Sequence, residues 1–170
     1  IVSRSEPVAV REHIGEDYFA LSGRWVEADF KVTVEGEEKI LTVVSAYVHS
    51  GEAGTPKQED KYRFLDVMAA RLPVLAATSD YALIVGDLNV GHTTLDIKNW
   101  KDERAYFDRF FSDEIGYVDV ARKLAGEVPG PYTWWSWRGQ AFDNDAGWRI
   151  DYHMATPALA ERAVSAVVDR

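Results

Sequence analysis

The chain contains no cysteine, and this absence removes several classes of protein at once. Without cysteine there is no disulfide scaffold, no zinc–thiolate site and no thiol nucleophile. Long apolar runs are also absent, since no stretch approaches the roughly 20 residues that a membrane-spanning helix requires. No signal-peptide pattern is present. We therefore expect a soluble, cytoplasmic protein, associated with the nucleoid if bacterial, that has no membrane partner.

Basic residues are outnumbered, because 19 Lys and Arg stand against 28 Asp and Glu and give a net charge of −9. Such a chain is not expected to hold nucleic acid through bulk electrostatics, as strongly basic domains do. An acidic enzyme can still gather carboxylates around a divalent cation and act on phosphate. The P-loop, the dinucleotide glycine fingerprint, the His-Glu-x-x-His zinc motif and the Gly-x-Ser-x-Gly elbow are all missing.

The hydrophobic pattern of the 170 residues predicts one domain, or part of one, of the α/β class with a mixed sheet or of the α+β class. Residues 25–34 alternate between apolar and polar, and a turn at 35–38 leads into a strand over 40–48, which predicts a hairpin. The apolar run at 81–85 predicts a strand buried on both faces. Further predicted elements are helices from 55, over 103–111 and from 156, and strands over 132–138, 148–154 and 164–168.

Two prolines shape the prediction for the first helix. Thr55 is expected as its N-cap, with Pro56 in the first turn and Gln58 completing a capping box. Pro73 is expected to end or kink the same helix, because proline lacks the backbone N–H that an inner turn needs.

The first segment with candidate catalytic residues is Gly86–His92, which directly follows the predicted buried strand over 81–85. Asp87 and Asn89 are two residues apart and point to the same side of extended backbone. A carboxylate beside an amide oxygen suits Mg²⁺, and Asp87 could also act as the general base for a water. The alternative is that both residues only form the turn after the strand.

The second segment is Gly147–Met154, in which Arg149, Asp151 and His153 share one face of the predicted strand. Asp151 is not expected to be buried without a partner. It either forms a salt bridge with Arg149 or another arginine, or orients a catalytic imidazole as the acid of a triad does.

Aromatic residues mark a third segment, Tyr132–Arg138, which holds Trp134 and Trp135 on opposite sides of the predicted strand. One ring facing outward offers a stacking surface for a base or a sugar, although a core strand is the alternative. Tyr47, at the end of the strand over 40–48, could reach a phosphate with its hydroxyl.

These segments, in this order, resemble the exonuclease III family of abasic-site endonucleases. The resemblance covers the chain from about Trp25 to its end. The wider superfamily of endonucleases, exonucleases and phosphatases shares Gly-Asp-x-Asn, whereas the Trp-rich segments select the DNA-repair branch. The motifs that carry the resemblance are Ala46-Tyr47-Val48, Gly86-Asp87-Leu88-Asn89-Val90, His92-Thr93, Leu95-Asp96-Ile97-Lys98-Asn99, Tyr132-Thr133-Trp134-Trp135-Ser136 and Gly147-Trp148-Arg149-Ile150-Asp151-Tyr152.

The resemblance implies a four-layer αββα sandwich with two mixed sheets, as in DNase I, and residues 1–170 as a partial domain of that fold. It implies Mg²⁺, with Mn²⁺ as an alternative, held by Asp87 and Asn89. The implied partner is double-stranded DNA with abasic sites or 3′ ends, cut by a monomeric enzyme. The implied catalytic residues are Tyr47, Asp87, Asn89 and Asp151, and the implied substrate-binding residues are Trp134, Trp148, Arg149 and Ile150.

The resemblance also implies segments that these 170 residues do not contain. A metal-binding Asn and Glu are expected before Ile1, and a Ser-Asp-His with the catalytic histidine after the last strand. A longer DNA-contacting loop is missing between Lys101 and Asp102, and Ser50 stands where relatives often have Asn. We therefore expect the 170-residue piece alone to be nearly inactive.

Two other functions fit parts of the same pattern. A non-catalytic relative that binds RNA or protein would share the fold, but would have no reason to keep the four catalytic residues together. A phosphatase-type member of the superfamily would share Gly-Asp-x-Asn, but would leave the Trp-rich segment unexplained.

Overall fold

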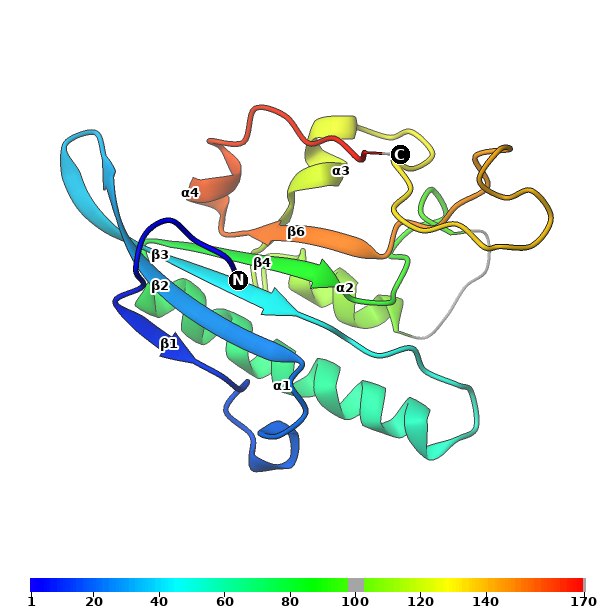
Figure 1. The fold of residues 1–170 in the computed structure, drawn as a ribbon, viewed down its shortest axis with the longest axis horizontal. Coiled ribbons are helices and arrows are strands. Elements are labelled where there is room, and N and C mark those ends of the chain that lie inside the picture. The colour runs from blue at the N-terminus through cyan, green and yellow to red at the C-terminus, as the bar shows by residue number, and fades with distance from the viewer. Residues whose placement is uncertain (98–102, 170) are drawn as a thin grey trace.

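The computed structural model describes residues 1–97 and 103–169. These residues form a six-stranded sheet in the order β1-β2-β3-β4-β6-β5 (Figure 1). Strands β3 and β4 are parallel and the other neighbours are antiparallel, so the sheet is mixed. The elements are β1 (Ala9–Arg11), the 3-10 helix η1 (Asp17–Phe19), β2 (Trp25–Val34), β3 (Glu37–Ala46), α1 (Pro56–Thr78), β4 (Tyr81–Asp87), α2 (Arg104–Phe110), β5 (Val118–Asp119), α3 (Val120–Ala125), β6 (Asp151–Ala155) and α4 (Pro157–Ala160).

The predicted hairpin is confirmed, and β2 has the predicted bounds. Its turn consists of Glu35 and Gly36, both with positive φ, which is the backbone that tight hairpins favour. Strand β3 begins and ends earlier than predicted, at Glu37 and Ala46. Val48 has left the pairing with β2, and its N–H donates instead to the carbonyl of Asp87 at 2.9 Å.

The capping box predicted for α1 is wrong, although Thr55 is at the N-cap and Pro56 is in the first turn. The Thr55 hydroxyl donates to the Glu52 carbonyl, and the Gln58 side chain donates to Glu103. The helix also continues past Pro73 to Thr78, so the predicted end is wrong. Burial of Leu72 and Leu75 on either side of the proline holds this turn against the core despite the missing hydrogen bond.

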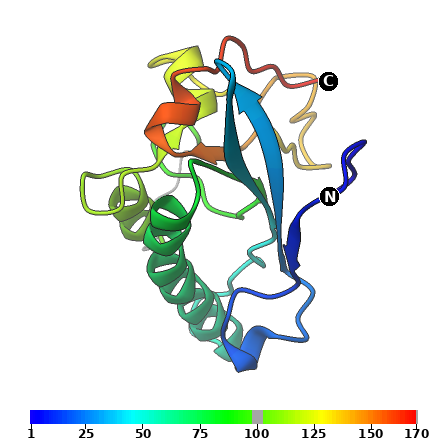
Figure 2. The same ribbon diagram turned by 90° about the vertical axis from the view of Figure 1, so that its left-hand side faces the viewer.

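Helices α1 and α2 cover one face of the sheet and enclose the main core (Figure 2). The predicted helix over 103–111 is confirmed as α2, within one residue at each end. Apolar side chains of both helices pack on alternate residues of β3, β4 and β6, as a half-buried strand pattern requires. The core includes Phe64, Leu65, Met68, Leu72, Phe107 and Phe110 from the helices, and Val44, Ile84, Tyr152 and Met154 from the sheet.

The two terminal segments lie on the other side of the sheet, away from α1 and α2 (Figure 2). Residues 1–7 lie near Val26 and Phe30 of β2, and residues 163–168 lie near β4 and β6. Residues 164–168 are irregular, so the predicted last strand is wrong. No strand in the described part of the chain pairs with this segment, and an unpaired strand leaves its backbone groups without partners.

The predicted strands at 132–138 and 148–150 are also wrong. Their pairing is reduced to a single bridge between Trp134 and Trp148, and β6 begins only at Asp151. The reason lies in Thr133, whose hydroxyl accepts the N–H groups of Ile150 at 3.1 Å and Asp151 at 3.2 Å. A side chain thereby takes the hydrogen bonds that a strand ladder would use.

The α/β class with a mixed sheet is confirmed. Within residues 1–97 and 103–169 there is one such sheet with its helices, so the second sheet of the expected sandwich is not part of the described chain. None of the helices in these two ranges is long and apolar enough to cross a bilayer.

Gly86 gives a first testable prediction, because it allows β4 to approach β3 closely. Its φ is +141°, and a Cβ on it would meet the Ala46 carbonyl oxygen at 1.9 Å. We expect Gly86→Ala to cost at least about 2 kcal/mol of unfolding free energy, measured by urea unfolding. Gly116→Ala is the control, since its φ is also positive but no atom lies within 4 Å of its Cβ position. Equal losses in both variants would contradict the close-approach explanation.

Candidate active site

The turn after β4 holds Asp87 and Asn89 in one hydrogen-bonded unit. The Asn89 N–H donates to Asp87 Oδ1 at 2.9 Å, and Asn89 Nδ2 donates to Asp87 Oδ2 at 3.2 Å and to the Val48 carbonyl at 2.8 Å. Asn89 has a φ of +51°, a backbone that asparagine tolerates better than most residues. These bonds use the amide nitrogen and leave Asn89 Oδ1 as an oxygen ligand or acceptor.

A buried ion pair between Lys61 and Glu103 contacts this turn from the side of α1. Lys61 of α1 is fully buried, and its Nζ lies 2.9 Å from the Asn89 carbonyl and 3.2 Å from Glu103 Oε1. Gln58 Nε2 donates to the same Glu103 oxygen at 3.1 Å. Burial opposes ionisation of Glu103, but hydrogen bonds and the Lys61 charge outweigh it and hold the pKa of Glu103 below its ordinary value. The Asn89 backbone is therefore fixed by a charged donor.

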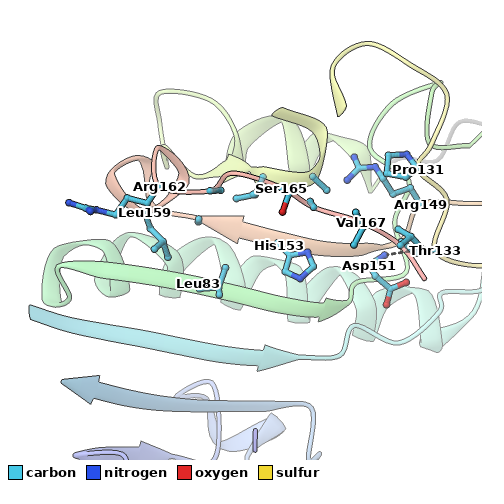
Figure 3. Close-up of a pocket in the computed structure, with 16 residues that line it drawn as sticks. Leu83, Pro131, Thr133, Arg149, Asp151, His153, Leu159, Arg162, Ser165 and Val167 are labelled. Atoms are coloured by element: carbon cyan, nitrogen blue, oxygen red, sulfur yellow. Dashed lines mark hydrogen bonds between the residues drawn. The ribbon is translucent and has the colours of Figure 1, made fainter. Parts of the chain in front are cut away.

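Asp151 lies directly opposite Asp87 in the antiparallel pair of β4 and β6. Among the residues that the structure describes, no side chain donates a hydrogen bond to the Asp151 carboxylate, while its N–H donates to Thr133 (Figure 3). Asp151 and His153 both line a cavity of about 400 Å³ on the sheet face away from α1. The alternative in which Asp151 pairs with Arg149 is wrong, because Arg149 binds Asp96 and Asp119.

Burial and charged neighbours together shift the pKa of Asp87. Burial raises its pKa most, and the nearby Asp151 charge raises it further, whereas the Asn89 N–H and the Lys61 charge act in the opposite direction. The net effect is a raised pKa. A carboxylate with a raised pKa is a stronger base toward a bound water, which favours the predicted role of Asp87.

Tyr47 follows β3 and is 46% exposed, with its N–H bonded to the Arg24 carbonyl at 2.8 Å. Because Val48 binds the Asp87 backbone, Tyr47 stands next to the Asp87 turn with its ring open to solvent. Behind it, His49 is buried between Arg24 Nη1 at 2.8 Å and the Lys57 carbonyl at 3.1 Å. Burial lowers the pKa of His49 and the Arg24 charge lowers it further, so this histidine is neutral and structural.

Aromatic rings lie beside the Asp87 turn. The rings of Trp134 and Trp148 are 4.6 Å apart between centroids, and 38% and 40% of these residues are exposed. Trp148 and Ile150 also line a cavity of about 60 Å³ together with Asn89. The structure thus brings the predicted catalytic residues and three of the four predicted substrate-binding residues to the same end of the sheet.

Arg149 is placed differently from the prediction. It is fully buried, and its guanidinium lies 2.7 Å from both Asp96 and Asp119. This geometry does not support a direct substrate contact. The sequence reasoning also missed Lys61, although a lysine within the apolar stripe of α1 was a signal that could have found it.

The donor set at Asp87 is compatible with a hard cation. Mg²⁺ usually takes one or two carboxylates and keeps several waters, so the oxygens of Asp87 and Asn89 fit this ion. In the described ranges, no group of three or more His, Cys, Asp or Glu side chains is arranged to hold a metal by itself. Lys98 and Asn99 of the predicted motif, and the Lys101–Asp102 junction, lie outside the described residues.

Comparison with known proteins agrees with this arrangement. The model of the Endonuclease/Exonuclease/phosphatase family matches residues 1–170. The chain belongs to this family. The predicted resemblance is thereby confirmed, and the α/β sheet with Asp87 at the carboxyl end of β4 is the part of the family fold that these residues form.

Relatives of the chain within the family include nucleases. The chain is 29% identical to an exodeoxyribonuclease of Bacillus subtilis over 99% of its length and 66% of the relative's. It is 30% identical to a DNA-(apurinic or apyrimidinic site) endonuclease of Dictyostelium discoideum over 95% of its length and 45% of the relative's. A solved AP endonuclease from Archaeoglobus fulgidus is 27% identical with a TM-score of 0.75, over 94% of this chain and 62% of that one. The chain therefore spans less than two thirds of these relatives.

Proposed function

We propose that the protein is a Mg²⁺-dependent DNA repair nuclease that hydrolyses phosphodiesters at abasic sites and at 3′ ends of duplex DNA. The observation that carries this proposal is the pair of facing carboxylates, Asp87 and Asp151, beside the exposed aromatic pair. The names of the relatives, exodeoxyribonuclease and AP endonuclease, support the same reaction class. The protein would act as a monomer on DNA.

The chemistry assigns each residue a task. Asp87 accepts a proton from the attacking water, and Asn89 offers its Oδ1, the amide atom that its hydrogen bonds leave open, as a ligand for the cation beside the reacting phosphate. Tyr47 contacts the phosphate through its exposed hydroxyl. Asp151 holds the catalytic histidine that the resemblance implies. Mg²⁺ or Mn²⁺ held by Asp87 and Asn89 would supply charge neutralisation.

The cavity and rings suit a nucleotide that lacks its base. Trp148 and Ile150 line an open cavity beside Asn89, and Trp134 packs on Trp148 and extends its apolar surface. Flipping a nucleotide out of the duplex costs least where the base is already lost, which by itself favours abasic sites.

The test uses the full-length protein with a duplex that carries one abasic site, in Mg²⁺ and in EDTA, followed by counting nicks. Metal-dependent nicking at the abasic site is expected. Retained DNA or RNA binding without cleavage would identify a non-catalytic relative. Release of phosphate from inositol phosphates without nicking would identify a phosphatase. Either of these two outcomes would contradict the proposal.

Trp148 gives a further prediction. We expect Trp148→Ala to lower kcat/KM on abasic DNA by about 10- to 100-fold, since stacking of one base or sugar on an aromatic ring is worth about 1–3 kcal/mol. Trp148→Phe should retain most of the activity because it keeps a ring in the cavity wall. Equal activity of Trp148→Ala and the unmodified protein would remove this residue from the site.

A further inference from the structure

Arg149 is one of the largest fully buried side chains in the described chain. Its Nε and Nη2 lie 2.7 and 3.1 Å from the carboxylate oxygens of Asp96. Its Nη1 and Nη2 lie 3.1 and 2.7 Å from those of Asp119. Both pairings are bidentate, the geometry in which guanidinium binds carboxylate with the greatest directionality. Four of the five N–H donors of Arg149 are therefore committed to two carboxylates inside the protein.

Asp96 is in turn the centre of the loop that follows the Asp87 turn. Its Oδ2 accepts the Thr93 N–H at 2.8 Å and the Thr93 hydroxyl at 3.0 Å. Its backbone carbonyl accepts the N–H of Arg149 at 3.1 Å. Arg149 thus holds Asp96 with both its side chain and its backbone.

The two segments joined in this way both contribute to the wall of the small cavity beside Asn89. Ile97, which follows Asp96, belongs to the wall formed by the first segment, and Trp148, which precedes Arg149, belongs to the wall formed by the second. Ile97 already packs tightly on Gly91, where an added Cβ would meet Ile97 Cγ2 at 2.4 Å. Ile97 is therefore held by close contact with Gly91 on one side and by the bonds that Arg149 makes with the neighbouring residue, Asp96.

A second arginine holds Asp96 from another side. Arg122 Nη2 lies 2.6 Å from Asp96 Oδ1 and 2.7 Å from the Gly130 carbonyl, and its Nη1 donates to the carbonyls of Gly126 and Val128. Arg122 is more exposed than Arg149, with 16% of its side chain accessible against 1%. Replacing Arg122 therefore weakens the hold on Asp96 without removing a fully buried side chain.

We propose that Arg149 is a positioning residue, which acts through Asp96 to set the separation between the Ile97 and Trp148 walls of the cavity and does not itself touch DNA. This proposal rests on the proposed nuclease function. It replaces the substrate contact that the sequence predicts for Arg149, and it assigns a role to the acidic residue of the Leu95–Ile97 motif.

The experiment compares Arg149→Lys and Arg122→Gln in the full-length protein. Arg149→Lys keeps the charge but loses the fork that binds two carboxylates. Arg109→Gln is the matched control, because Arg109 forms an exposed ion pair with Glu114 at 2.8 Å outside the cavity. Four quantities are measured. On abasic duplex DNA these are kcat, KM and the slope of log kcat/KM against log salt concentration, and on the protein without DNA it is the far-UV circular dichroism of the Trp134–Trp148 pair.

The circular dichroism signal depends directly on the position of Trp148 relative to Trp134, because rings whose centroids are 4.6 Å apart couple their electronic transitions. Trp134→Phe identifies the band. We expect Arg149→Lys to weaken this band and to lower kcat about 10- to 100-fold, the cost of a misplaced site, with the salt slope unchanged. Arg122→Gln should change the band and kcat in the same direction with a smaller effect. If Arg149→Lys does not unfold cooperatively on heating, and is therefore misfolded, the Arg122→Gln results decide the test. Arg109→Gln should change nothing.

Two results would overturn the proposal. A raised KM with unchanged kcat and a salt slope smaller by about one would show that Arg149 contacts a phosphate. An unchanged dichroism band with unchanged kinetics in both variants would show that the cavity does not depend on this cluster. If the unmodified protein cuts no DNA, the proposed function fails, but the dichroism arm still decides whether Arg149 places Trp148.

Discussion

Replacing Asp87 with asparagine should remove cleavage and at the same time stabilise the fold. Loss of the base that activates water is worth roughly 10²- to 10⁴-fold in rate. The stabilisation follows from the raised pKa of Asp87, which burial causes in the first place. Because the folded state binds this proton more tightly than the unfolded state does, the ionised carboxylate costs stability at neutral pH. Asparagine carries no charge and keeps an oxygen for the Asn89 N–H, and it gives up only the longer bond that Asp87 Oδ2 accepts from Asn89 Nδ2 at 3.2 Å.

The measurement is thermal unfolding in EDTA, together with single-turnover cleavage in Mg²⁺. The stability difference between Asp87→Asn and the unmodified protein should be present near pH 7 and disappear as pH falls below the ordinary aspartate pKa, where both states are protonated. Added Mg²⁺ should raise the midpoint of the unmodified protein more than that of the variant, since ligands stabilise the state that binds them. A variant that is less stable than the parent at pH 7 would contradict this account of the site.

The second large effect concerns the ion pair beneath Asn89. Lys61→Ala should lower the unfolding free energy by about 3–5 kcal/mol, because it leaves Glu103 buried without its cation. It should also reduce cleavage, since the Asn89 carbonyl loses a charged donor worth about 1.5–3 kcal/mol. Urea unfolding and kcat measure the two effects separately.

A double variant separates support of the fold from support of the site. Lys61→Met with Glu103→Gln removes both charges and keeps an acceptor for Gln58. Apolar or neutral replacements of buried ion pairs are often neutral or better for stability, so we expect stability to recover to within about 1 kcal/mol. Cleavage should stay at least about tenfold below the parent. Full recovery of both properties would show that Lys61 serves the fold alone.

The strands and helices that build the main core were predictable because their patterns are local. The alternation in 25–34 marks one buried face. The apolar run at 81–85 predicts the strand β4 correctly, but its burial on both faces only in part, because Ala82 and Ile84 are buried while Leu83 and Val85 on the other face are half-buried. The errors lie where side chains replace backbone pairing, as Thr133 does for the predicted strand at 132–138. Residues 164–168 have strand-like composition, but a strand also requires a partner, which composition does not record.

The candidate site divides in the same way. Asp87, Asn89 and Asp151 were predictable because each is part of a short motif at a strand end, and the pairing of β4 with β6 brings them together. Lys61 and Glu103 lie far apart in sequence and meet only because α1 packs beneath the turn. The partners of Arg149 were hidden for the same reason, because Asp96 and Asp119 lie 53 and 30 residues away from it in sequence.

The most direct test of the central claim follows the oxygen that enters the product. Cleavage of an abasic duplex by the full-length protein in ¹⁸O-labelled water, analysed by mass spectrometry, shows whether water attacks phosphorus. The account predicts one labelled oxygen in the product phosphate for each cut, and no labelled product from Asp87→Asn. Strand breaks without label in the phosphate would mean cleavage by elimination at the sugar, and would contradict hydrolysis at the Asp87 site.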